Sequence, residues 1–136
     1  MALDLPRFSG ETLASSLETL TLEWTATTNG VALTFDAPAA AVVPIGGIVT
    51  RAWAVISTAI SGGGVTTCAF GDAVDPNRWG DAGALIANTT IIGQTAVPVA
   101  TASGTYTSRV TLDAAATAGA VRCFVQYEIP VFSHTY

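Results

Sequence analysis

The chain has 136 residues, which is enough for one hydrophobic core but leaves little for a second independent domain. Half of the residues are hydrophobic and only 11% are charged, which excludes a disordered chain, because disorder requires low hydrophobicity and high charge. The net charge is −5 and the five basic residues are scattered arginines, so the composition also argues against binding to a nucleic-acid backbone.

Two segments lack the features of a membrane-spanning helix or of an export signal. The most apolar stretch, residues 37–60, is interrupted by prolines, glycines and Arg51, so it is no continuous membrane-spanning helix. The first ten residues contain Asp4, Pro6 and Arg7 where a signal peptide requires an unbroken apolar segment. We therefore expect a protein with no membrane partner, whose charge-poor surface is largely covered by other subunits. A monomer solubilised by its hydroxyl side chains is the alternative.

Residues 1–19 are expected to form an N-terminal arm or a short helix. Ser9 is a candidate N-cap, and Leu13, Leu17 and Leu20 follow at helical spacing. The remainder, residues 20–136, is expected to form one β-sandwich domain.

The first strand pattern begins at Leu20, where apolar and polar residues alternate as far as Thr27. A second alternating run covers residues 31–35, and Asn29-Gly30 lies between the two. Asn-Gly tolerates the positive φ angles of a type I′ turn, so this region predicts a β-hairpin.

A long strand is predicted over residues 48–60, and both of its faces are apolar. One face is expected to hold Ile48, Ala52, Ala54, Ile56 and Ile60, and the other Val49, Trp53, Val55 and Ala59. Such a strand is covered on both sides, either by a second sheet and a loop or by another subunit. Gly62–Gly64 then predicts a turn, because the run lacks the Lys and Ser or Thr of a phosphate loop.

Residues 71–83 predict an irregular loop after a strand at 65–70. Asp72, Asp75 and Asp81 offer hard oxygen ligands that would suit Ca²⁺, but Arg78 lies among them and is placed to neutralise a carboxylate. We favour a loop held by Asx turns and an Arg–carboxylate pair. Trp79 either stacks on a sugar or, as we favour, plugs one end of the sandwich.

Weak strands are predicted at residues 84–92 and 95–99, and clear ones at 105–112 and 121–131, with a helical turn or loop at 113–119 between the clear pair. Tyr106, Ser108, Val110 and Leu112 should share one face of the first clear strand. Val121, Cys123, Val125, Tyr127, Ile129 and Val131 should share one face of the second. About eight short strands predict an all-β fold, an antiparallel β-sandwich of jelly-roll type.

Catalytic and cofactor motifs are missing from the sequence. His134 is the one histidine, and neither a nucleophile elbow, a zinc-protease motif, a phosphate loop nor a CxxC pair occurs. Glu23 and Glu128 would serve as a glycosidase pair only if their strands adjoin; exposed edge charges are the favoured interpretation. Cys68 and Cys123 allow one disulfide or two thiols, and we favour buried thiols. We expect no enzyme activity, no cofactor and no metal.

Several segments between Gly47 and Tyr127 resemble small structural proteins of tailed-phage virions. The segments are a long apolar strand (IVTRAWAVISTAI), a glycine turn, a strand ending in FGD, a DPNRWGD loop, a GTYT strand and a final TAGAVRCFVQYE. The resemblance implies a β-sandwich component such as a decoration or cement protein, a head fibre or a tail-associated module, and commonly a trimer. Residues 1–46 have no counterpart in it.

Two functional hypotheses follow. In the first, the chain is a capsid decoration or cement protein of the virion, assembled in the host cytoplasm as a homotrimer that contacts the major capsid protein or another virion protein without binding nucleic acid. Its expected interface residues are Trp53, Arg51, Val55, Leu13 and Leu17. In the alternative, the chain is a glycan-binding module of a tail fibre or adhesin that uses Asp72, Asp75, Arg78 and Trp79.

Overall fold

The fold is built almost entirely from β-strands. The computed structural model describes residues 17–28, 33–92, 99–100 and 106–130. In chain order the elements are β1 (Leu17–Thr27), β2 (Thr34–Asp36), the single-turn 3₁₀-helix η1 (Ala39–Ala41), β3 (Ile48–Ser61), β4 (Cys68–Asp72), β5 (Gly80–Ala82), β6 (Thr90–Ile92), β7 (Val99–Ala100), β8 (Ser108–Leu112) and β9 (Ala118–Pro130). The all-β prediction is therefore confirmed.

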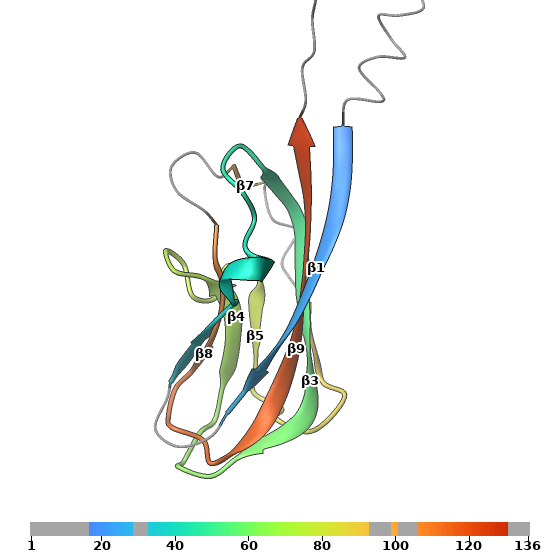
Figure 1. Cartoon of the computed structure of the whole chain (residues 1–136). Coiled ribbons are helices and arrows are strands. Elements are labelled where there is room, and N and C mark those ends of the chain that lie inside the picture. Colours follow the sequence, from blue (N-terminus) through green and yellow to red (C-terminus); the bar gives the residue numbers. More distant parts are fainter. Residues whose placement is uncertain (1–16, 29–32, 93–98, 101–105, 131–136) are drawn as a thin grey trace, which may run out of the picture.

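The strands form two antiparallel sheets that pack face to face (Figure 1). The long sheet has the order β1-β9-β3-β6, with β7 also paired to β3, and the short sheet has the order β2-β8-β4-β5. The pairs are nested in the sequence: β4 pairs with β5, β3 with β6, β2 with β8 and β1 with β9. This nesting makes the chain cross repeatedly between the two sheets, and the sandwich predicted from the strand count is confirmed.

The predicted N-terminal hairpin is wrong. β1 pairs with β9 through all of its 11 residues, while β2 pairs with β8 in the opposite sheet. The Asn29-Gly30 turn itself lies outside the described residues. A turn signal is local, whereas β1 and β9 carry matching alternation along 11 paired residues. β1 also begins at Leu17, so the leucines at helical spacing continue into a strand.

A β-bulge corrects the predicted faces of β3. The register with β9 shifts between Val49 and Arg51, so Thr50 is an extra residue and the alternation changes phase there. Val49 consequently faces the core together with Ala52, although the sequence pattern assigned them to opposite faces. Within the described residues, the short sheet covers the inner face, whereas Trp53 and Val55 on the outer face are only half-buried.

The turns and loops follow the sequence with small changes of length. Gly62, Gly63 and Gly64 all have positive φ, as the predicted turn requires. β4 runs to Asp72, and β5 returns beside it, so part of the predicted 71–83 loop is a hairpin. Only Thr90–Ile92 of the predicted 84–92 strand is extended, and no helical turn forms in the segment from Asp113 to Thr117.

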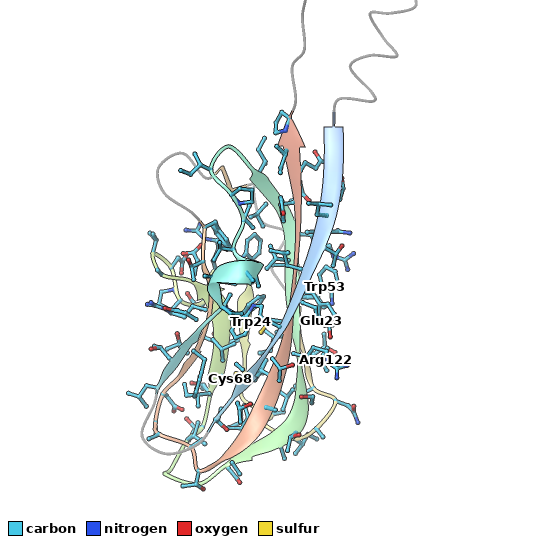
Figure 2. All side chains as sticks on the ribbon, viewed as in Figure 1. Glu23, Trp24, Trp53, Cys68 and Arg122 are labelled. Carbon is cyan, nitrogen blue, oxygen red and sulfur yellow. The ribbon has the colours of Figure 1, made fainter. Side chains whose placement is uncertain are left out.

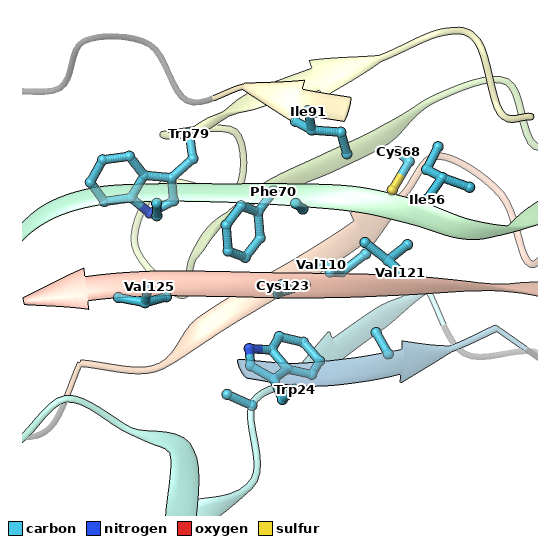
Figure 3. Packing of buried hydrophobic residues seen from close by; sticks show 14 of the residues in the cluster. Trp24, Ile56, Cys68, Phe70, Trp79, Ile91, Val110, Val121, Cys123 and Val125 are labelled. Atoms are coloured by element: carbon cyan, nitrogen blue, oxygen red, sulfur yellow. The ribbon is translucent and has the colours of Figure 1, made fainter. Parts of the chain in front are cut away.

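The core lies between the two sheets (Figure 3). The predicted inward residues of β8 and the described inward residues of β9 are buried or, for Ile129, half-buried. Cys68 and Cys123 are buried free thiols, which confirms the favoured interpretation. Burial raises the pKa of the Cys68 thiol to about 12 and raises the pKa of Cys123 as well.

Candidate interaction surface

The side of the long sheet that faces away from the core carries the most distinctive surface of the described residues. We call it the outer face, and Figure 2 shows Trp53, Glu23 and Arg122 on it. Because side chains of a strand alternate, each strand of the sheet sends one residue set inward and the other outward. The outer face includes Glu23 and the threonines in its phase from β1, Arg51, Trp53 and Val55 from β3, and Arg122, Phe124, Gln126 and Glu128 from β9.

An aromatic pair forms the centre of the outer face. Trp53 and Phe124 are directly opposite each other in the β3–β9 register. Their ring centroids are 5.2 Å apart and the planes differ by 10°, so the rings are stacked. The guanidinium carbon of Arg51 lies 4.7 Å from the Trp53 ring centroid, within cation–π range. Three side chains therefore support one another in fixed positions although none of them is in the core.

Charge is sparse and paired around the aromatic stack. Arg122 Nε lies 3.3 Å from Glu23 Oε1, and both side chains are more than half exposed. A pair of this kind contributes little to stability, since water screens it. The aromatic centre of the face is therefore surrounded by polar side chains and a few charged ones, Glu23, Arg51, Arg122 and Glu128. This is the usual composition of a protein–protein contact region.

Three of the predicted interface residues, Arg51, Trp53 and Val55, are brought together on the outer face. Leu13 lies outside the described residues, and the side chain of Leu17 is not described. Phe124 was not among the predicted interface residues. The sequence did contain an indication of its role: Phe124 is an aromatic residue at a position of β9 where the alternation otherwise places polar side chains.

The Asp72 loop is an internally satisfied structure. The Asp72 carboxylate accepts hydrogen bonds from the backbone N–H groups of Val74 and Asp75, at 2.9 and 2.8 Å, and from Arg78 Nε at 2.5 Å. The predicted Asx turn and Arg–carboxylate pair are therefore confirmed. Burial alone would raise the pKa of Asp72, but these hydrogen bonds outweigh it and hold the pKa below its ordinary value. Gly71 is required here, since a Cβ would lie 2.2 Å from the Asp75 carbonyl oxygen.

Trp79 does not present a face for a ligand. Its side chain is only 1% exposed, and its Nε1–H donates to the Tyr106 hydroxyl at 2.6 Å. Burial and the nearby Asp72 carboxylate raise the pKa of Tyr106, so its hydroxyl stays protonated. This burial contradicts the glycan-stacking role of Trp79. It agrees with the favoured interpretation that Trp79 packs into the sandwich, whereas its expected place at one end remains a prediction.

The acidic residues that the structure describes do not gather at one place. Glu23 is opposite Phe124, whereas Glu128 is opposite Thr19, four positions further along the same strand. The two carboxylates are therefore roughly 14 Å apart along the strands, beyond the separation of about 5–10 Å that glycosidases use. Within the described ranges, no three acidic, cysteine or histidine side chains are arranged to hold a metal ion.

The comparison with known proteins identifies a fold. No protein-family model matches the chain, and no curated protein matches it. A phage capsid chain shares the fold. This chain, from the cyanophage Pam1 capsid asymmetric unit, aligns with a TM-score of 0.60 and 19% identity over 85% of the present chain and 87% of its own length. A chain from the acidic stable capsid structure of Helicobacter pylori bacteriophage KHP30 aligns with a TM-score of 0.48 and 17% identity, over 88% and 99% of the two chains.

At these identities the similarity to the Pam1 chain concerns the fold. The two chains are also close in length, because nearly equal shares of each are covered. No helix in the described part of the chain is long and apolar enough to cross a membrane.

Proposed function

We propose that this chain is a non-enzymatic structural protein of a phage virion, and specifically a decoration or cement protein of the capsid. The observation that carries the proposal is the fold shared with a capsid chain of similar length. The sparse charge of the sequence and the outer face with its aromatic centre support it, because both suit a protein that is largely covered in an assembly. In this role the chain has no cofactor and does not bind nucleic acid.

We infer that the sandwich is a jelly roll. Rolling up one long antiparallel hairpin gives nested pairs, in which the first strand pairs with the last and the innermost two pair with each other. The observed pairs β1–β9, β2–β8, β3–β6 and β4–β5 have this nesting, and they alternate between the two sheets. Two Greek keys wound in this way are the arrangement that the term describes, and it is common among viral capsid proteins.

The outer face is the surface that we assign to contact with the shell. Trp53 and Phe124 are already stacked and Arg51 is held over the ring, so binding would lose little side-chain freedom. Tryptophan and arginine are also among the residues that contribute most binding energy at interfaces. The N-terminal arm, residues 1–16 with Leu13, would add a second contact on a neighbouring subunit, next to Leu17 at the start of β1. Three copies would bridge adjacent shell subunits.

A co-sedimentation experiment tests the proposal. Purified wild-type chain is mixed with shells that lack it, and the bound fraction is measured at increasing concentration. Trp53→Ala should reduce affinity at least tenfold if the stack is a binding hot spot. Arg109→Gln is the matched control for Arg51→Gln, because Arg109 belongs to the short sheet and pairs with Asp36 there. Unchanged binding by both outer-face variants would contradict the assigned surface, and absence of wild-type binding would contradict the function.

The arm and the oligomer have separate tests. Deletion of residues 1–16 should abolish binding to shells while the melting temperature of the sandwich stays close to that of the wild type. Full retention of binding would refute the role of the arm. Light scattering after size-exclusion chromatography should give the mass of a trimer or of a multiple of it, and a monomer would argue against the assembly as a whole.

A further inference from the structure

The edge of the long sheet at β1 has no partner strand among the described residues. β1 pairs with β9 on one side, and the register gives it no strand on the other (Figure 1). Its 11 residues form a much longer edge than β2, β5 or β6, which have 3 residues each. A long edge exposes a row of backbone donors and acceptors that can pair with another strand.

Along β1, alternate residues direct their backbone N–H and C=O groups toward β9 or away from it, within the plane of the sheet. The Thr28 N–H donates to the Gly119 carbonyl at 2.9 Å, so residues in phase with Thr28 bond to β9. The β1–β9 register is unbroken back to Leu17, so the same phase includes Trp24, Leu22 and Leu20. The opposite phase directs its N–H and C=O groups away from β9 and comprises Leu17, Thr19, Thr21, Glu23, Thr25 and Thr27.

This edge lacks several of the features that normally prevent strands from pairing, and its charged residues are Glu18 and Glu23. β1 contains no proline, lysine or arginine, and no bulge interrupts its register. The positions whose backbone groups point away from β9 are threonines except for Leu17 and Glu23, and threonine has high β-propensity. Near its N-terminal half, the inward-facing Leu20 remains 39% exposed and Leu22 is only half-buried. Both the backbone and the apolar side chains of this half are therefore incompletely covered.

We propose that the β1 edge pairs with the β1 edge of a second copy, antiparallel, about a two-fold axis at Thr21. This register places Thr21 opposite Thr21 of the second copy as a hydrogen-bonded pair, and it continues in both directions from Leu17 to Thr25. Leu20 of each copy then faces Leu22 of the other, which covers the side chains left exposed in a single copy. Glu23 faces Thr19, so the two glutamates are not opposite each other.

The pairing would join the long sheets of two copies into one continuous sheet. It involves the edge and not the outer face, so Trp53 and Phe124 would stay available to another partner. A two-fold contact is also compatible with a three-fold contact through a different surface, because an icosahedral shell contains both kinds of axis. The inference rests on the geometry of β1 and stands independently of the capsid role.

The first test compares Thr21→Pro with Thr21→Val by light scattering and sedimentation velocity. Proline removes the outward N–H of Thr21 without removing a hydrogen bond to β9, and proline is tolerated on edge strands. Valine keeps that N–H and favours the strand. We expect the proline variant to have half the mass of the wild type and the valine variant to have the wild-type mass. Near-ultraviolet circular dichroism checks that the proline variant keeps its tertiary packing.

The second test fixes the register and does not depend on the proline variant. Thr21→Cys should form a disulfide with the same position of a second copy under mild oxidation, because Cα atoms of a hydrogen-bonded pair are about 5.5 Å apart. Thr25→Cys is the matched control on the same edge. Its two copies would be roughly 27 Å apart, eight strand rises, and should not cross-link.

Three results would overturn the inference. One is a wild-type mass that corresponds to an odd number of copies at all concentrations. The second is equal cross-linking at positions 21 and 25, which would indicate random collision. The third is slow hydrogen exchange of the Thr21 amide in a monomer, which would mean that another segment of the same chain covers the edge. Loss of shell binding in Thr21→Val, in contrast, would bear on the capsid role and leave the edge pairing unaffected.

Discussion

Two aspartate–arginine pairs of the described residues have different surroundings, and they predict very different effects on stability. Arg109 contacts both oxygens of Asp36, whereas Arg78 contacts Asp72 through Nε, and the Asp72 carboxylate also accepts two backbone hydrogen bonds. Asp72–Arg78 and Asp36–Arg109 both have a shortest N–O distance of 2.5 Å. The Asp72 side chain is 5% exposed and the Asp36 side chain is 46% exposed. Replacement of each aspartate by alanine therefore compares a buried pair with a surface pair.

The cost of Asp72→Ala follows from what the substitution leaves behind. Two backbone N–H groups and the Arg78 guanidinium lose their common acceptor. Breaking a buried pair costs about 3–5 kcal/mol. Because the Arg78 side chain is 26% exposed, it can turn into water and recover part of this cost. We therefore expect Asp72→Ala to lower the free energy of unfolding by about 3 kcal/mol. Asp36→Ala should cost less than about 1 kcal/mol, the usual value for a surface pair.

Urea unfolding at neutral pH measures both values, and Asp72→Asn separates the charge from the shape. Because the folded-state pKa of Asp72 is lowered, its carboxylate stabilises the protein above the unfolded-state pKa, near 4, and this contribution is lost as the pH falls through the folded-state value. The difference between wild type and Asp72→Asn should therefore shrink at acidic pH. Equal losses for Asp72→Ala and Asp36→Ala would refute the reasoning.

Two further predictions concern the turn and the thiols. Gly63→Ala should destabilise the protein by at least about 2 kcal/mol more than Gly64→Ala. Both glycines have positive φ, but only at Gly63 would a Cβ meet a backbone oxygen, that of Ala115 at 1.6 Å. Thermal melting compares the two variants, and equal melting temperatures would contradict the steric argument. Cys68 and Cys123 should not react with a thiol reagent in the native protein at pH 8, because both thiols are buried and burial raises their pKa values. Both should react in urea. Fast labelling of the native protein would show that the core opens readily.

The periodicity of the sequence identified most strands and their buried faces but not their partners. The alternation of β9 identified Val121, Cys123, Val125 and Tyr127 as inward residues, and all four are buried. The same alternation contains no information about which strand lies alongside. The Asn-Gly signal was assigned to a hairpin for this reason, although the partner of β1 is at the other end of the chain.

Local hydrogen-bonding chemistry was predicted better than surface geometry. Asp72 and Arg78 are close in sequence, so their pairing follows from turn chemistry alone. The outer face depends on the long-range register between β3 and β9 and on the bulge at Thr50, which shifts one face by a residue. Trp53 was expected at an interface, but its stacking on Phe124 requires that register to be known.

The pairing of β1 with β9 has a consequence for how the chain folds. β9 emerges from the ribosome after every other described strand, and it lies between β1 and β3 in the long sheet. Until then β1 has no partner and β3 lacks its longest neighbour, so the two layers cannot close during synthesis. Contacts between distant parts of a chain also form slowly. We therefore expect folding to be a late, all-or-none event. A chain truncated before β9 should leave β1 unpaired and should tend to aggregate.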